Sequence, residues 1–380
     1  MRETLVTLRR DLHRHPSLSE KEQPTADRLA AWLREHAPGR FVEGLGGAGL
    51  AVIYEGSASG PTVLLRAELD ALPIAEGGEL DHESALPGVS HKCGHDGHMA
   101  LLAGVASMFS RVPPEAGRVV ALFQPAEEIG TGARAVIADP RYAELRPDFA
   151  FALHNLPGFP SGAVAVRQGT FAAASEGLEV RLTGASSHAS EPHLGTSPAL
   201  ALSQLIQALL ALPAQHLPMD GCAAVAVTHA RLGEPSFGVA AGDATVQATL
   251  RASTTADLQR LMAAAERVAA GLAQAQGLDA ACSRHDRFAA TVNDPDAVGM
   301  IERAASDCEL SLAAIEGPFP WSEDFGEFLA GCRGAMFGLG AGPECAPLHN
   351  EYYDFPDELL EPGALALAAC ASIALEGGAR

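Results

Sequence analysis

Apolar positions recur at helical spacing in the first part of the chain. Residues 2–14 and 20–36 each repeat them every three to four positions, as an amphipathic helix does. In the second segment, Ala26, Leu29 and Leu33 would fall on one face. The pattern therefore predicts that the chain opens with two helices that each bury one side.

Short apolar runs bounded by glycine and proline follow, and such runs are typical of strands buried on both faces. The predicted strands are residues 50–54, 62–67, 119–123 and 149–153. A helix is predicted between them, over residues 97–109. Strands that alternate with helices predict an α/β fold in which helices cover both sides of a sheet.

The pattern changes near residue 176. From there the predicted order is β-α-β-β-α-β, which is the split βαβ unit of ferredoxin-like α+β domains. Its elements are a strand at 178–183, a helix at 198–212, strands at 223–232 and 244–251, a helix at 257–276 and a strand at 278–286.

The first pattern then returns, with a helix at 295–308, a strand at 334–340 and a helix at 361–375. The simplest architecture is a small domain inserted into a larger one. We expect residues 1–174 and 288–380 to form the larger, catalytic domain, and residues 175–287 to form the insertion.

Charge excludes one class of partner. The chain has 26 basic and 47 acidic residues in 380, a formal net charge of −21, so a nucleic-acid backbone would be repelled. The first residues show no signal-peptide pattern, and no run approaches the ~20 apolar residues that cross a bilayer. Seven scattered cysteines without a C-x-x-C pair favour reduced thiols. We expect a cytoplasmic protein that binds neither nucleic acid nor membrane.

A dense group of metal-binding side chains lies at residues 91–98, HKCGHDGH, just before a predicted helix. Cys93 and His95 are separated by one glycine, so a tight loop can direct a thiolate and an imidazole at the same cation. The alternative is a polar helix N-terminus that Asp96 simply caps. So many ligand types in so few residues favour the metal site.

A second group, Glu127 and Glu128, follows a buried strand. Adjacent buried carboxylates repel each other, which raises a pKa unless a cation neutralises one of them. One carboxylate could then bind metal while the other acts on activated water. Most Glu-Glu pairs, however, are solvated surface residues.

Two single histidines complete the pattern. His154 ends an apolar run, and His349 follows a glycine-rich strand exit. Each alone is more often structural. Cys93, His95, Glu128 and these two histidines together are too many ligands for one tetrahedral zinc ion, but they suit two ions that share a bridging group.

Motifs along nearly the whole chain resemble the dinuclear-metal aminoacylase/carboxypeptidase family, in the amidohydrolase branch that includes hippuricase and the plant indole-acetyl-amino-acid hydrolases. The segments that carry the resemblance are LRRDLHRHPSLSEKE, RAELDALPI, HKCGHDGHMA, FQPAEEIGTGA, ALHNLPG, GASSHASEPH, WSEDF and LHNEYYDF. Their order and spacing make the resemblance specific. It implies a zinc-peptidase-like catalytic domain and an inserted lid that mediates dimerisation.

The resemblance also implies roles for individual residues. Glu127 takes the place of the general base, and His188 that of a lid histidine that reaches the partner subunit's site and donates to the carbonyl oxygen. Asp70 would support a metal ligand. The metal ligands implied are Cys93, His95, Glu128, His154 and His349, which would hold two divalent ions, zinc or manganese, with cobalt or nickel possible.

Three departures from the family pattern concern specificity. Glu68 stands where this branch usually has aspartate, and Gly238 stands where the lid usually carries an asparagine that recognises the substrate carboxylate. Ser186 and Ser187 replace the usual glycines before His188. The metal site is therefore expected to be intact, while the specificity can differ from that of the family.

The predicted activity is hydrolysis of N-acyl amino acids or similar small amides by metal-activated water. One alternative is a carboxypeptidase or dipeptidase that acts on unblocked peptides. Another is a metal-dependent ligand-binding protein that has lost catalysis, although such a protein would not need Glu127. A serine hydrolase is disfavoured because the chain contains no G-x-S-x-G motif.

Overall fold

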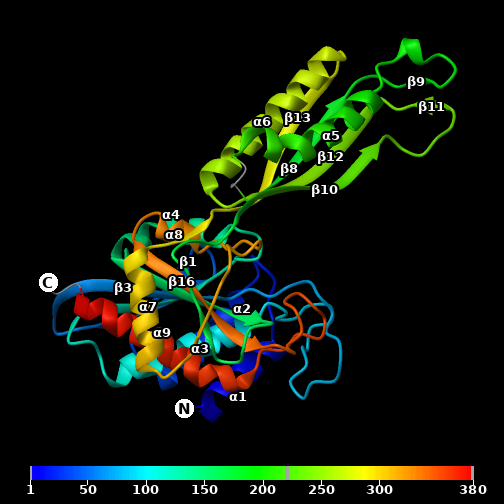
Figure 1. Cartoon of the computed structure of the whole chain (residues 1–380). Coiled ribbons are helices and arrows are strands. Elements are labelled where there is room, and N and C mark those ends of the chain that lie inside the picture. The colour runs from blue at the N-terminus through cyan, green and yellow to red at the C-terminus, as the bar shows by residue number, and fades with distance from the viewer. Residues whose placement is uncertain (1, 219–221, 378–380) are drawn as a thin grey trace. The chain divides into compact units, whose positions relative to one another are not determined.

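The computed structural model describes residues 2–218 and 222–377, which divide into two compact units. The first unit contains residues 1–171, 291–317 and 323–380, and the second contains 172–290 and 318–322. Each unit has its own hydrophobic core. Figure 1 traces the elements in chain order.

The first unit is built on an eight-stranded mixed sheet with the order β1-β2-β4-β3-β5-β16-β6-β15. Its main strands are β1 (Arg40–Leu45), β2 (Gly49–Glu55), β3 (Ala58–Glu68), β4 (Ala116–Gln124), β5 (Phe149–Pro157) and β16 (Arg333–Gly342). The short strands are β6 (Val164–Ala165), β7 (Gly169–Ala172), β14 (Thr291–Asn293) and β15 (Leu312–Ala313), of which β7 and β14 pair separately. The predicted α/β class and mixed central sheet are confirmed.

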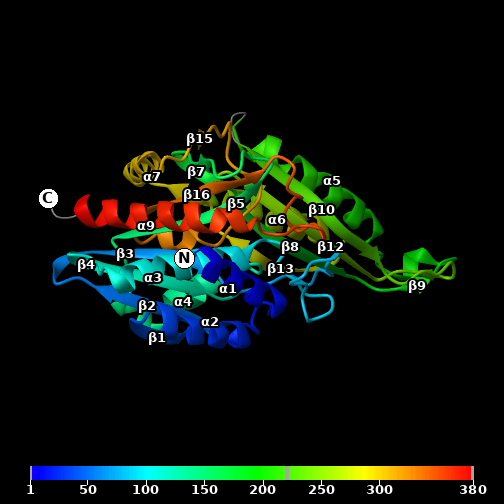
Figure 2. The same cartoon turned by 90° about the horizontal axis from the view of Figure 1, so that it is seen from below.

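Helices pack against this sheet on the face that holds the main core. They are α1 (Arg2–Arg14), α2 (Gln23–His36), α3 (His95–Arg111), α7 (Pro295–Asp307) and α9 (Leu360–Gly377). Figures 1 and 2 show α3 and α9 side by side, and both contact β3. The smaller helices α4 (Gly132–Ala138) and α8 (Gly326–Leu329) contact β4 and β16, and the 3₁₀ turns are η1 (Pro140–Glu144) and η3 (Asp357–Leu359).

The last helix has an apolar composition for a structural reason. Among the described residues, Asp357–Gly377 is the one segment long and apolar enough to suit a membrane span. Its Leu360, Leu367 and Ala371 are fully or almost fully buried in the main core of the first unit. Packing against the sheet therefore accounts for its apolar character.

The second unit is a four-stranded antiparallel sheet with the order β10-β12-β8-β13. Its elements are β8 (Ala174–Thr183), α5 (Ala199–His216), β10 (Ala223–Leu232), β12 (Asp243–Ala252), α6 (Thr255–Ala275) and β13 (Asp279–Phe288). Both helices lie on one face of the sheet (Figure 1). The predicted β-α-β-β-α-β order is confirmed.

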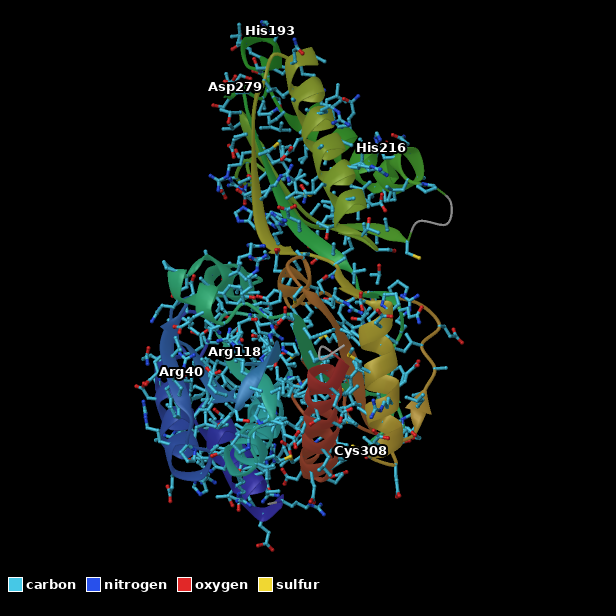
Figure 3. All side chains as sticks on the ribbon, turned by 90° about the vertical axis from the view of Figure 1, so that its left-hand side faces the viewer. Arg40, Arg118, His193, His216, Asp279 and Cys308 are labelled. Atoms are coloured by element: carbon cyan, nitrogen blue, oxygen red, sulfur yellow. The ribbon has the colours of Figure 1, made fainter. Side chains whose placement is uncertain are left out.

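A small arm extends this second unit. Strand β9 (Ser187–His188) pairs with β11 (Val239–Ala240), and the 3₁₀ turn η2 (Pro192–Leu194) follows β9. Figure 3 labels His193 in that turn, Asp279 at the start of β13 and His216 at the end of α5, all of them exposed. The arm places His188 beside Val239 and therefore next to Gly238.

Candidate metal centre and active site

Four neighbouring strands of the main sheet, β4, β3, β5 and β16, run parallel to one another. Their carboxyl ends therefore meet at one edge of the sheet, where α/β proteins commonly bind ligands. The predicted site residues of the first unit come from these ends: Asp70 follows β3, Glu127 and Glu128 follow β4, His154 lies near the end of β5, and His349 follows β16.

Cys93 and His95 reach this edge from the loop before α3. The loop turns at Gly94, whose φ is 91°, and a Cβ there would lie 2.5 Å from the side-chain oxygen of Asn155. Glycine is therefore required between the two candidate ligands. Helix α3 begins at His95, so the predicted start at residue 97 was two residues late.

The hydrogen bonds of two histidines fix which ring nitrogen faces the site. His95 Nδ1 donates to the carbonyl of Asp70 at 2.8 Å, and His154 Nδ1 donates to the carbonyl of Asn155 at 2.9 Å. In the neutral ring, each Nε2 therefore carries a lone pair. His154 Nε2 lies 3.5 Å from Cys93 Sγ, and the buried His95 Nε2 makes no hydrogen bond among the described residues.

The carboxylates of Glu127 and Glu128 face this free nitrogen. His95 Nε2 is 3.9 Å from Glu127 Oε2 and 3.8 Å from Glu128 Oε1. The other oxygen of Glu128 lies 3.7 Å from His349 Nε2. Ligand atoms of Cys93, His95 and His154 lie within 4.8 Å of one another, as do those of Cys93, Glu128 and His349. The two trios share Cys93.

The electrostatics of the site favour cations. Burial and the neighbouring Glu323 and Glu128 raise the pKa of Glu127 well above its usual range. Burial opposes a charge on His95, but the surrounding carboxylates outweigh it and raise its pKa to about 10. Burial and the carboxylates also raise the pKa of the Cys93 thiol. A divalent cation would reverse these shifts, because it stabilises thiolate and carboxylate together.

Asp70 supports two of the candidate ligands through its hydrogen bonds. It is fully buried, and its Oδ2 accepts the Glu128 backbone N–H at 2.9 Å and the Ser19 hydroxyl at 2.7 Å. Its Oδ1 lies 3.6 Å from His95 Nδ1. Asp70 thus contacts the backbone or ring of two candidate ligands.

His98 belongs to a separate pair. Its Nδ1 donates to Glu68 at 2.7 Å, and its Nε2 accepts the backbone N–H of Asn155 at 3.2 Å. Both ring nitrogens are therefore occupied, which leaves His98 no lone pair for a metal. Its ring packs against that of His154 with centroids 4.8 Å apart. Glu68, where the family usually has aspartate, thus orients a ring beside a candidate ligand.

A second buried network, which pattern reasoning did not find, joins the segments that carry Cys93, His95 and His349. His13 donates from Nδ1 to Asp96 at 2.8 Å and from Nε2 to Glu76 at 2.7 Å. Lys92 Nζ donates to Glu76 at 2.6 Å and to the carbonyl of Tyr353, in the segment that carries His349, at 2.8 Å. Asp96 therefore accepts bonds from other elements and makes no side-chain cap on α3.

Replacing His13 by glutamine is expected to destabilise the protein in a pH-dependent way. Burial opposes its charge, but Asp96 and Glu76 outweigh burial and raise the pKa of His13 from 6.5 to about 9. A group whose pKa is higher in the folded state than in the unfolded state stabilises the fold. This stabilisation is complete below the unfolded-state pKa and is lost as the pH rises through the folded-state pKa. The free energy of unfolding of the wild type should exceed that of His13→Gln by about 3 kcal/mol near pH 6, and this difference should shrink towards pH 10.

Urea unfolding of both proteins across that pH range measures this difference. His229→Gln, which changes an exposed histidine of the second unit, is the control and should show no such pH dependence. A difference between wild type and His13→Gln that stays constant from pH 6 to 10 would contradict the charged state of His13.

His188 lies in the second unit and is exposed. Its Nδ1 accepts the backbone N–H of Ser190 at 3.2 Å and lies 2.7 Å from the Ser190 hydroxyl. In the neutral ring the proton is therefore on Nε2, which makes that atom a hydrogen-bond donor. The neighbouring Gly238 has no side chain; its carbonyl accepts the Ala189 N–H at 3.1 Å, and its N–H donates to the Ser236 hydroxyl at 3.2 Å.

Comparison with known proteins identifies the family. A model of peptidase family M20/M25/M40 matches residues 64–372. The chain is 30% identical over 377 residues to an N-acetyldiaminopimelate deacetylase of Leuconostoc citreum, covering 96% of this chain and 95% of that one. It is also 30% identical over 381 residues to thermostable carboxypeptidase 1 of Saccharolobus solfataricus, covering 97% and 94%.

The chain belongs to peptidase family M20/M25/M40. This confirms the resemblance that the motifs indicated. The crystal structure of a Bacillus subtilis member described as a dinuclear metal-binding peptidase superposes with a TM-score of 0.84 at 27% identity, covering 99% of this chain and 98% of that one. The M20 chain described here is accordingly an amidohydrolase of the metallopeptidase type.

Proposed function

We propose that this M20 protein hydrolyses the amide bond of N-acyl amino acids and similar small amides at a site for two divalent cations. Cys93, His95, Glu128, His154 and His349 would hold the cations. One observation carries the proposal: His95 Nε2, which makes no hydrogen bond among the described residues, lies within 4 Å of both Glu127 and Glu128, beside the trios of candidate ligand atoms that share Cys93. Buried carboxylates and a thiol in this arrangement need positive charge.

Bound cations would polarise the scissile carbonyl and lower the pKa of water at the site. Glu127 takes the proton from the attacking water and returns it to the departing nitrogen. Asp70 holds the His95 ring through its backbone carbonyl and the Glu128 loop through its carboxylate. His188 donates from Nε2 to the carbonyl oxygen as that atom gains negative charge.

We also propose that the chain is a homodimer in which the second unit, the lid, supplies His188 to the partner's site. Strands β10 and β13 lie at the two edges of the lid sheet, so strand edges are open to pairing with another copy. The proposed metal is zinc or manganese, and cobalt and nickel also suit this set of thiolate, imidazole and carboxylate ligands. A cytoplasmic location stays a prediction.

A carboxypeptidase or dipeptidase is the second candidate, and one observation favours it. A relative of equal identity, from Saccharolobus solfataricus, is named a thermostable carboxypeptidase. The two candidates differ in whether the amino group of the substrate is acylated.

A substrate panel with metal removal tests both candidates. Protein treated with a chelator is expected to lose turnover, and about two equivalents of Zn²⁺ or Mn²⁺ should restore it. N-acetyl and N-benzoyl amino acids should be cleaved faster than free dipeptides. Faster cleavage of unblocked peptides would support the carboxypeptidase. Thermal stabilisation by N-acyl amino acids without any turnover would contradict both and indicate a binding protein.

A further inference from the structure

The loop that carries Glu127 and Glu128, residues 125–131, is held by buried carboxylates from other parts of the first unit. Each carboxylate accepts one backbone N–H of the loop or of the residues just after it. The bonds run from Ala126 to Glu22 (2.8 Å), from Glu128 to Asp70 (2.9 Å) and from Ala133 to Asp324 (2.8 Å).

Asp324 differs from the other two because it holds both ends of the loop. Beyond the bond from Ala133 at the start of α4, its two oxygens accept the side-chain amide of Gln124, each at 2.9 Å. Gln124 is the last residue of β4, immediately before the loop. One carboxylate therefore fixes where the loop leaves the sheet and where it enters the helix.

Arg66 in turn fixes Asp324. Its Nη2 donates to Asp324 Oδ1 at 2.7 Å, and its Nε donates to the side-chain oxygen of Gln124 at 2.9 Å. Glu323 binds the same guanidinium through both oxygens, at 2.8 and 3.1 Å. All of these side chains are almost completely buried. A paired, fully hydrogen-bonded arginine gives a planar and directional anchor.

The loop itself has little room to adjust. Ala126 adopts a left-handed φ of 51°, uncommon for a residue other than glycine. A Cβ on Gly132 would lie 1.6 Å from the carbonyl oxygen of Pro125, so the two ends of the loop touch. A shift at either end must therefore move Glu127 and Glu128 with it.

We propose that Asp324, locked by Arg66, is a positioning residue that sets the placement of Glu127 and Glu128. Its hydrogen bonds go to Gln124, Ala133 and Arg66, so it acts through the two ends of the loop. The inference rests on the proposed function, since it takes Glu128 as a ligand and Glu127 as the base. Buried partners that orient ligand-bearing groups change metal affinity or activity by roughly 10–100-fold when removed.

The test is Asp324→Asn, measured by titrating metal-free protein with Co²⁺. The amide cannot accept from Gln124 and Arg66 as the carboxylate does, so the loop loses one anchor. We expect Co²⁺ affinity to fall roughly 10–100-fold, the visible absorption spectrum of bound Co²⁺ to change, and kcat to fall roughly tenfold or more while KM stays within about twofold.

Asp294→Ala is the control for a general loss of stability. Asp294 accepts the N–H groups of Asp296 and Ala297 at the start of α7, as Asp324 does for α4, but it contacts no residue of the site. Because alanine removes the helix cap, this variant should lose stability while its Co²⁺ affinity and spectrum stay those of the wild type. The comparison separates loop positioning from a general loss of stability.

A wild-type Co²⁺ affinity and spectrum in Asp324→Asn would overturn the proposal. If that variant does not fold, Gln124→Met decides, because it removes the same bridge with a side chain of similar size. It should weaken Co²⁺ binding roughly threefold or more, and wild-type binding would overturn the proposal. The Co²⁺ readout is independent of turnover, so a failed substrate panel would refute the proposed function and leave this result interpretable.

Discussion

Replacing Glu127 by alanine is expected to lower kcat by roughly 10²–10⁴-fold on N-acyl amino acids, while about two divalent ions remain bound per chain. Glu127 is buried, and its Oε2 lies 3.9 Å from His95 Nε2, beside the proposed ligands. Since five other side chains are proposed as the ligands, Glu127 is left to accept the proton. The companion variant Glu127→Gln keeps the volume and should lose turnover similarly.

Steady-state kinetics with elemental analysis of the same samples measures both quantities. Glu115→Ala, which changes an exposed glutamate of the first unit, is the control and should keep full activity. Full activity in Glu127→Ala would remove the base from the mechanism. Loss of one bound ion together with turnover would instead make Glu127 a ligand.

Hydrophobic pattern predicted most of the elements, because buried parallel strands and amphipathic helices have strong local signals. The first helix was predicted at its observed bounds, and the alternation of the second unit gave the right element order. Strand β1 was missed because it lies at the sheet edge and only two of its residues, Val42 and Leu45, are buried. An edge strand needs little apolar surface, so its pattern is weak.

The candidate site residues that lie at the ends of predicted strands could be found from the sequence. Glu128, His154 and His349 lie at the carboxyl ends of parallel strands, a position that sequence order and strand prediction together define. The contacts between Arg66 and Asp324 were not predictable, because the two residues are 258 positions apart. Arg66 lies within an apolar run, and nothing near it in the sequence indicates its carboxylate partners. Two of these partners, Glu323 and Asp324, belong to the distant WSEDF motif.

Mixing two inactive variants is expected to restore activity if His188 serves the partner's site. His188→Ala alone should lower kcat by roughly 10²–10³-fold, as the loss of an oxyanion donor does. In a heterodimer of His188→Ala with Glu127→Ala, one site would combine an intact Glu127 with an intact His188 from the other chain. Random pairing makes half of the dimers mixed, so about a quarter of wild-type activity should return.

Co-expression of the two variants with different affinity tags, followed by purification of the doubly tagged dimer, raises the expected recovery to about half. His193→Ala, on the same arm and labelled in Figure 3, is the matched control and should keep activity by itself. If His188 served its own chain, each site of the heterodimer would lack one group and the mixture would stay inactive. A fully active monomer in analytical ultracentrifugation would likewise contradict a role in trans, and the second unit would then act as a lid within one chain.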